Sequence, residues 1–375
     1  MRSSSPIGTL PFHVFVFDFQ YNTSEKEEGR KRHRLEQGGR RGSTHAQVLY
    51  WNYMDEKSYR IEKCDGKVQW DEFILENSGH PMQLWGWGDA RASLGWQVDR
   101  LFIVEEDRQI GAVQILIKRL PRPFGLCLYI PRGPVIIENE TAVYEQMITF
   151  VKANYHGVAL IVEPGDDKEP AGTGWRESDI HALSPRTIIF DLSKADGVLL
   201  AEMDQNTRDH IRAAGKAELN IKKLGNPEDI GACYQLYRES MDRRGDKPHK
   251  EKYFHDLHDK LGEFSIIFGA YEGDDLISFL WLATSETVAV ELYGGITTRG
   301  LEVAADYGLR WEAMRRIKQW GVRTYDIGGV DPRNENDVRR GFGSEYTDRG
   351  TFVLPTSPFY SLWKRAVRSR TNYAE

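Results

Sequence analysis

Short runs of apolar residues alternate with polar turns and longer helical stretches over most of the chain. In the first half, two β-rich runs flank the polar turn Glu105–Arg108, and a helical stretch separates two further strands. The expected strands are Leu101–Glu105, Gln109–Lys118, Leu126–Ile130 and Val158–Glu163, and the expected helix is Glu140–Asn154.

The second half repeats this order around the polar turn Glu272–Asp275. The expected strands are Phe264–Tyr271, Leu276–Ala283, Ala289–Tyr293 and Thr324–Gly329, with a helix over Leu301–Trp320. Ile110 and Leu276 are 166 residues apart, whereas Tyr129 and Tyr293, like Ile161 and Tyr325, are 164 apart. The near-constant offset predicts an α/β (α+β) fold made of one module used twice. Each module would be a mixed sheet flanked by helices, with a right-handed strand–helix–strand unit.

Residues 1–53 do not share this patterning. They carry eight Lys/Arg and five Asp/Glu, and residues 24–42 are nearly all charged or Gly. We expect a disordered or non-native N-terminal extension, with Met54 as an alternative start. A nucleic-acid-binding arm is the functional alternative to a solvated tail. The first module would comprise residues 54–185 plus 345–375, because the C-terminal helix returns to it, and the second module residues 186–344.

Composition narrows the class of protein. The 375 residues are 40% hydrophobic and carry a net charge of −6, which excludes a wholly disordered chain and disfavours a protein that coats DNA or RNA. No run of about 18 apolar residues indicates a membrane span. The three cysteines (Cys64, Cys127 and Cys233) are far apart, so we expect neither a disulfide framework nor a zinc site. This usage suits the reducing cytoplasm.

A charged helix is expected between the modules. Arg208 and Arg212 are four residues apart and Lys216 follows one turn later, so they form a cationic stripe suited to a diphosphate. The alternative is a solvated helix with Glu202 and Asp209 as ion-pair partners.

The segment order resembles that of acetyltransferase-type (GNAT) folds. The loop after each module's strand lacks the glycine-rich pattern that binds the pyrophosphate of acyl-CoA, and Gly294–Gly300 matches it poorly. Coenzyme A is therefore not strongly indicated, and no metal or other cofactor is expected.

Seven segments together resemble the FemABX family of aminoacyltransferases. They are Gln83–Trp87 with Arg91 and Gly95-Trp96, Tyr129–Val135, Thr187–Ser193, Asn206–Ala214, Leu292–Gly295, Tyr325–Gly329 and Val338–Gly343. The resemblance spans about Trp70 to Trp363 and implies two tandem GNAT-like acyltransferase modules. It implies transfer of an amino acid from aminoacyl-tRNA, as co-substrate, to a UDP-linked or lipid-linked muropeptide, which forms the amide of an interpeptide bridge.

The resemblance also implies roles for particular residues. Arg91, Arg208 and Arg212 would meet the phosphates of the precursor, together with Lys216. Tyr129 and Tyr293 would line the groove, and Arg339 would stabilise the oxyanion or orient the acyl-tRNA end. Relatives carry an Asp shortly after the Pro-Arg-Gly-Pro motif, where this chain has Glu138, so Glu138 is a weak candidate for a base.

Two other functions stay open at this point. One is a GNAT-type N-acyltransferase that uses acyl-CoA on a surface glycan or small-molecule amine, and the other is a degenerate relative that binds a precursor without turnover. We expect a cytoplasmic monomer that does not bind DNA. A basic C-terminal helix edge is compatible with peripheral membrane contact or a tRNA contact. The sequence identifies neither the transferred amino acid nor the acceptor residue.

Overall fold

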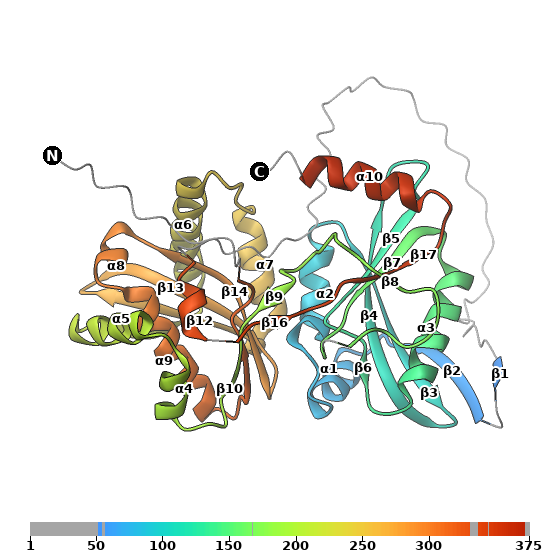
Figure 1. The fold of residues 1–375 in the computed structure, drawn as a ribbon, viewed down its shortest axis with the longest axis horizontal. Coiled ribbons are helices and arrows are strands. Elements are labelled where there is room, and N and C mark those ends of the chain that lie inside the picture. The colour runs from blue at the N-terminus through green and yellow to red at the C-terminus, as the bar shows by residue number, and fades with distance from the viewer. Residues whose placement is uncertain (1–51, 55–56, 167, 331–336, 344, 372–375) are drawn as a thin grey trace, which may run out of the picture.

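A computed structural model describes residues 52–54, 57–166, 168–330, 337–343 and 345–371. The described chain folds into two modules that lie side by side, each built on its own sheet (Figure 1). The predicted extension, residues 1–53, lies outside the described residues except for its end. Asn52–Met54 forms strand β1 and pairs with β2, so this end belongs to the first sheet and the predicted boundary is too late.

The first sheet has the strand order β1-β2-β3-β4-β5-β7-β17-β8, and the short β6 pairs with β4. Its strands are β2 (Lys57–Lys63), β3 (Gln97–Glu105), β4 (Arg108–Arg119), β5 (Leu126–Pro131), β6 (Val135–Ile136), β7 (Gly157–Glu163), β8 (Arg176–Glu177) and β17 (Phe352–Pro355). Strands β5 and β7 are parallel, and β17 brings the C-terminal segment back beside β7 in the antiparallel sense.

The second sheet has the order β10-β15-β14-β13-β12-β11. Its strands are β10 (Ile189–Asp191), β11 (Asn220–Leu224), β12 (Ser265–Glu272), β13 (Asp275–Thr284), β14 (Val288–Ile296) and β15 (Thr324–Asp326). β14 and β15 are its parallel pair, and β10 pairs antiparallel with β15 as β17 does with β7 in the first sheet. The two sheets therefore repeat one plan, as the residue offsets predict. The strands β9 (Arg186–Thr187) and β16 (Thr347–Asp348) form a separate pair between the modules.

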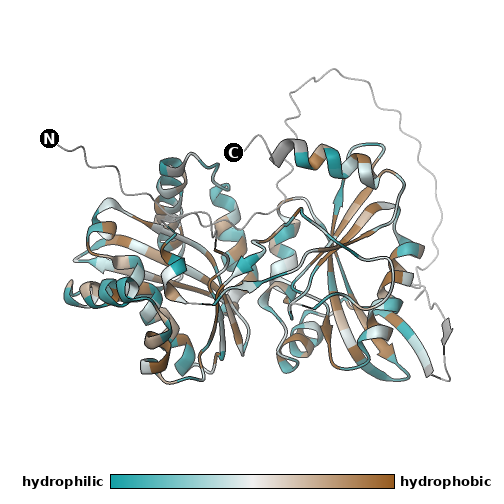
Figure 2. Cartoon of the chain, viewed as in Figure 1, coloured by the Kyte–Doolittle hydropathy of each residue, from teal (hydrophilic) through white to brown (hydrophobic). Residues whose placement is uncertain are grey.

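Helices cover both faces of each sheet. In the first module these are α1 (Lys67–Glu76), η1 (Pro81–Gln83), α2 (Trp85–Ala92), α3 (Glu140–Asn154) and α10 (Tyr360–Thr371). In the second they are α4 (Asp196–Glu202), α5 (Gln205–Lys216), α6 (Pro227–Arg244), α7 (Glu251–Leu261), η2 (Gly262–Phe264), α8 (Thr298–Glu302), α9 (Ala305–Gln319) and η3 (Val338–Phe342). The strands are mostly hydrophobic, whereas α5 is largely hydrophilic (Figure 2). No helix of the described chain combines the length and apolarity needed to cross a bilayer.

One predicted helix and one predicted strand are interrupted in the structure. The expected helix Leu301–Trp320 is two helices, α8 and α9, because Ala304 adopts a left-handed conformation with φ of 53°. A non-glycine residue in this region costs energy and interrupts the helical path. The expected strand Thr324–Gly329 likewise ends at Asp326, since Gly328 turns with φ of 81° against the backbone of Glu291.

Candidate active site at the junction of the modules

Three residues predicted to bind substrate, Arg91, Tyr129 and Tyr293, lie near one another where the modules meet. The Arg91 guanidinium lies 4.4 Å from the ring centre of Trp87 and 5.6 Å from that of Tyr253. Burial raises the pKa of both Tyr129 and Tyr293, and the positive charge of Arg91 opposes this rise at both phenols. The site thus combines a buried cation with aromatic walls drawn from both modules.

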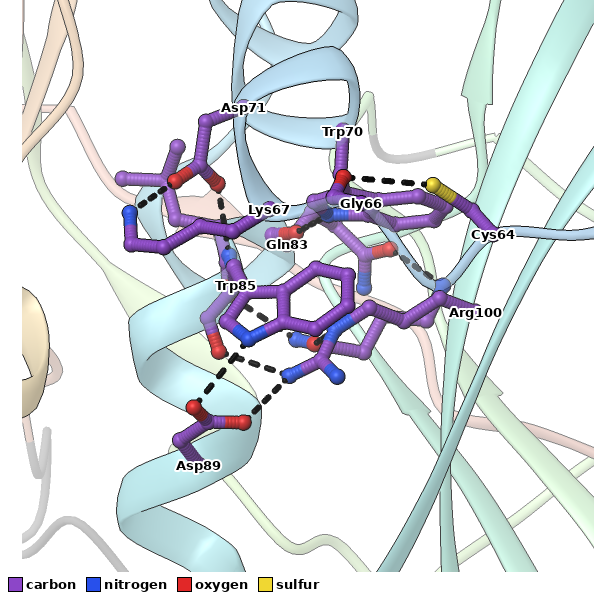
Figure 3. A network of polar contacts seen from close by, with 11 residues as sticks. Cys64, Gly66, Lys67, Trp70, Asp71, Gln83, Trp85, Asp89 and Arg100 are labelled. Carbon is purple, nitrogen blue, oxygen red and sulfur yellow. Dashed lines mark hydrogen bonds and ion pairs between the residues drawn. The ribbon is translucent and has the colours of Figure 1, made fainter.

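A polar network fixes helix α2, which carries Trp87 and Arg91 (Figure 3). Arg100 on β3 donates to Asp89 Oδ1 at 2.9 Å and to the Trp85 carbonyl at 2.7 Å. Asp71 on α1 accepts from the Trp85 backbone N–H at 2.8 Å. These bonds join α1, α2 and β3 and hold the first turn of α2 in place, so the direction of Arg91 is set by its helix.

Close packing then brings α2 against α7 of the second module. A Cβ on Gly86 would lie 2.0 Å from the Lys260 carbonyl oxygen, so only glycine permits this approach. One hydrophobic cluster runs across the junction, because Met82, Trp87 and Ala90 pack with Tyr253, Phe254 and Tyr293. The site is therefore built by both modules.

Tyr129 donates to a buried carboxylate, Glu163, at 2.5 Å. Glu163 ends β7 and also accepts from the backbone N–H groups of Ala182 and Leu183, at 2.8 and 3.2 Å, and from Thr351 at 3.0 Å. These four donors satisfy both oxygens of the carboxylate. Glu163 therefore ties the linker and the returning C-terminal segment to β7.

Two more buried arginines, Arg132 and Arg349, lie in the same region, and Arg132 interacts with the charges of Tyr129, Glu163 and Arg349. Arg349 pairs with Asp326 at 3.2 Å and donates to the Gly165 carbonyl at 2.9 Å. Burial, followed by the charge of Arg349, lowers the pKa of Arg132. Burial also lowers the pKa of His80 well below its usual range, and the two arginines add to this effect, so the imidazole is neutral.

The second module holds a buried ion pair of its own. Arg310 on α9 donates to Glu291 on β14 at 2.6 and 3.1 Å, and Tyr325 donates to the same carboxylate at 2.5 Å. Burial raises the pKa of nearby Asp306. Arg339 lies in η3, buried, with Nε and Nη2 on the Asp337 carboxylate at 2.9 and 2.8 Å. Phe342 of η3 stacks on Tyr307 of α9, so η3 and α9 together position Arg339.

The predicted cationic stripe on α5 lies apart from Arg91. Helix α5 packs on α9 and η3 at the outer side of the second module, whereas α2 lies at the junction (Figure 1). Arg208 bonds to the Met203 carbonyl and to Gln205, and Arg212 pairs with Asp209, while Lys216 is exposed. The structure therefore does not gather the four predicted phosphate-binding residues into one site.

Glu138 is also remote from the site, which corrects its candidacy as a base. It forms an ion pair with Arg108, at the turn between β3 and β4. Tyr129 faces Leu116 on the same strand β4, eight residues from Arg108, or about 25 Å at the usual rise per residue. The exposed position of Glu138 and its ion pair with Arg108 suit a surface role.

Sequence reasoning missed Arg132, Glu163, Asp326 and Arg349. Arg132, Glu163 and Asp326 are charged residues at or beside the end of an apolar strand, and Arg132 lies inside the motif Tyr129–Val135. A search for single charges that end buried strands would have found Glu163 and Asp326. Arg349 carries no such signal, because its partner Asp326 is distant in sequence.

The fold and the site define a class, an acyltransferase-type protein with two tandem GNAT-like modules. A FemAB family model matches residues 66–168, and an acetyltransferase (GNAT) domain model matches residues 201–337. The crystal structure of FemX superposes with a TM-score of 0.70 at 17% identity, over 81% of this chain and all of that chain. The C-terminal domain of a protein described as a lysylphosphatidylglycerol synthetase from Agrobacterium fabrum gives 0.53 at 11% identity, over 82% and 96%.

Named relatives agree with this assignment. A lipid II:glycine glycyltransferase of Staphylococcus epidermidis is 25% identical over 215 residues, which is 52% of this chain and 51% of that protein. One from Staphylococcus aureus is 25% identical over 241 residues, or 58% and 54%. The chain spans about half the length of the curated relatives it matches. In sequence and in fold, the chain is thus similar to proteins of the FemABX family.

Proposed function

We propose that this chain is a tRNA-dependent aminoacyltransferase that adds an amino acid to the stem peptide of a peptidoglycan precursor. The observation that carries the proposal is the buried cationic and aromatic site around Tyr129, built by both modules of a FemABX fold. Its relatives are glycyltransferases of lipid II, which is a peptide-bearing acceptor.

The proposed reaction needs no redox partner. The acceptor amine, as its free base, attacks the ester carbonyl of aminoacyl-tRNA, and a C–N bond forms while the C–O bond to the tRNA ribose breaks. The amine proton passes to the departing ribose oxygen, directly or through solvent. Aminoacyl esters are already activated, so positioning and charge stabilisation supply much of the rate. In this proposal Arg339 stabilises the oxyanion or orients the acyl-tRNA end.

A lipid-linked acceptor fits the surface next to the site. Phe359 and Leu362 on α10 are 44% and 55% exposed. Arg119, Arg122 and Arg365 are exposed nearby and form no ion pair within the described chain. Leu120 and Phe124 of the same loop as Arg122 pack in one cluster with Tyr129 and the buried side of α10. We infer that this cationic and apolar surface rests on the cytoplasmic face of an anionic membrane.

The test uses the purified full chain with a mixture of charged tRNAs and either UDP-linked or lipid-linked muropentapeptide. Mass spectrometry of the acceptor should show a tRNA-dependent gain of one residue mass, which RNase treatment abolishes. Arg339→Ala should lower the rate strongly, and Arg340→Ala, its neighbour in η3, is the matched control.

An acyl-CoA-dependent N-acyltransferase is the second candidate, favoured by the GNAT domain match over residues 201–337. It predicts saturable binding of acetyl-CoA and a gain of acyl mass on an amine without any tRNA. If the acceptor gains mass from acetyl-CoA but not from charged tRNA, the aminoacyl proposal fails.

A further inference from the structure

Six arginines are buried in the described chain: Arg91, Arg100, Arg132, Arg310, Arg339 and Arg349. Four of them donate hydrogen bonds to carboxylates or carbonyls, as Arg100 does to Asp89, Gln114 and Trp85. Arg91 and Arg132 are 3% and 6% exposed, and neither side chain has a hydrogen bond or ion pair among those found in the described chain; Nη1 of Arg91 is fully buried without a partner. An unbonded buried charge is costly, so these two guanidinium groups are not explained by the fold alone.

The two unbonded arginines share a neighbour. The charges of both Arg132 and Arg91 oppose the rise in the pKa of Tyr129, which burial and Glu163 cause. Tyr129 itself is occupied, because its hydroxyl donates to Glu163. Both guanidinium groups therefore act electrostatically on this phenol without being bonded to it.

Other unpartnered groups in this region are donors as well. Trp87 Nε1 and Trp96 Nε1 are buried without a hydrogen-bond partner in the described chain. His80 Nε2 is also unpartnered, while Nδ1 accepts from the Met82 backbone N–H at 3.1 Å. Because the neutral ring accepts at Nδ1, its proton sits on Nε2. Three ring N–H groups and Nη1 of Arg91 are thus buried donors without an acceptor in the described chain.

The charged residues of this region indicate the charge of a ligand that would bind there. Arg91, Arg132 and Arg349 contribute three positive charges, and Glu163 and Asp326 two negative charges. Among these described residues one positive charge is left over, which one carboxylate balances, whereas a diphosphate would bring at least two negative charges. The indole donors suit peptide carbonyl oxygens, and the aromatic rings of Trp87, Tyr253 and Tyr293 suit apolar side chains.

We infer that Arg132, with Arg91, anchors a carboxylate of the acceptor peptide, while the indoles of Trp87 and Trp96 bond to its carbonyl oxygens. This deepens the proposed function and rests on it only for the nature of the acceptor. The anchor holds the peptide from its acidic group, so the amine to be acylated stays free of the guanidinium groups.

Calorimetric titration of the full chain tests the anchor without tRNA or turnover. The probes are the pentapeptide L-Ala-γ-D-Glu-L-Lys-D-Ala-D-Ala, the same peptide with its carboxyl groups amidated, and UDP-N-acetylglucosamine, which carries a diphosphate but no peptide. Wild type should bind the free acid at least about tenfold more tightly than the amide, as expected for loss of a buried charge-assisted bond. Arg132→Gln should remove this preference, and Arg132→Lys should keep part of it.

The thermal stability of variants distinguishes a ligand-binding role of Arg132 from a structural one. Arg132→Gln should leave the Tm unchanged or raise it, because an unbonded charge leaves the interior. The control Arg310→Gln should lower the Tm, since it breaks the buried pair with Glu291 in the second module, and should keep the preference for the acid where the protein stays folded. Three outcomes overturn the inference: equal binding of acid and amide by wild type, an unchanged preference in Arg132→Gln, or loss of UDP-N-acetylglucosamine binding alone, which indicates a phosphate site. Absence of transfer activity with intact acid preference would overturn only the proposed function.

Discussion

Glu163 shows how one residue connects distant parts of the chain. Its carboxylate receives hydrogen bonds from Tyr129 on β5, from the linker at Ala182 and Leu183, and from Thr351 before β17. No local pattern predicts these partners, because they lie from 19 to 188 residues away. The sequence does identify Tyr129 and Arg91 through their motifs, but not the buried carboxylate and arginines that surround them.

Replacing Glu163 by Gln should destabilise the protein by about 1–3 kcal/mol, since an amide keeps only part of the acceptor capacity of the buried carboxylate. Urea denaturation followed by tryptophan fluorescence measures this loss. Glu138→Gln is the matched control, because its exposed ion pair is worth no more than about 0.5 kcal/mol. If both variants were equally stable, Glu163 would not hold the linker and the C-terminal segment to β7.

His80 should make the stability of the folded protein depend on pH. The folded state lowers the pKa of His80, so the unfolded chain binds the proton more readily. Stability should therefore fall as the pH drops below about 6.5, by up to about 1.4 kcal/mol per pH unit from this group. His80→Gln should flatten the curve relative to wild type between pH 6.5 and 5. Parallel curves for the two proteins would show that His80 is not held neutral.

At the scale of elements, the repeated order of strands is readable from the sequence, but the places where helices break or touch are not. The strand–helix–strand units predict both parallel pairs, β5 with β7 and β14 with β15. The break between α8 and α9 depends on the left-handed Ala304, which has no signature in its residue type. Periodicity likewise assigns a cationic face to α5 without indicating that this helix packs away from α2.

The contact between α2 and α7 offers a sharp test of how Arg91 is positioned. Gly86→Ala would place a methyl group 2.0 Å from the Lys260 carbonyl oxygen, so the two helices must separate. We expect a loss on the order of 3 kcal/mol by thermal or urea denaturation, together with a loss of transfer activity. Gly215→Ala in α5 is the control, because nothing lies within 4 Å of its Cβ and alanine favours the helix by up to about 1 kcal/mol. A Gly86→Ala protein as stable and active as wild type would contradict the tight junction.

For the whole molecule, the sequence predicts two modules but not the surface that they present. The apolar face of α10 predicts that this helix packs on the body of the protein, and Tyr360, Trp363 and Val367 do pack on the first sheet. The exposed Phe359 and Leu362 become meaningful only when the fold brings the loop with Arg119 and Arg122 to the same end of the module. Figure 1 shows α10 lying along this end, clear of the second module.

The inferred membrane surface predicts that the full chain sediments with vesicles containing anionic phospholipid and not with neutral ones. Leu362→Asp should weaken this binding about fivefold or more, because an apolar contact is replaced by a charge that the membrane repels. Val198→Asp on α4 is the control, since Val198 is 48% exposed on the other module. Equal binding by the two variants would remove α10 from the contact.

The most direct measurement of the central claim is the mass of the acceptor after reaction with charged tRNA. The account predicts that lipid-linked muropentapeptide gains the mass of one amino acid residue, that RNase prevents the gain, and that Arg339→Ala slows it. An acceptor whose mass stays unchanged with charged tRNA, in both lipid-linked and UDP-linked form, while acetyl-CoA acylates an amine, would contradict it.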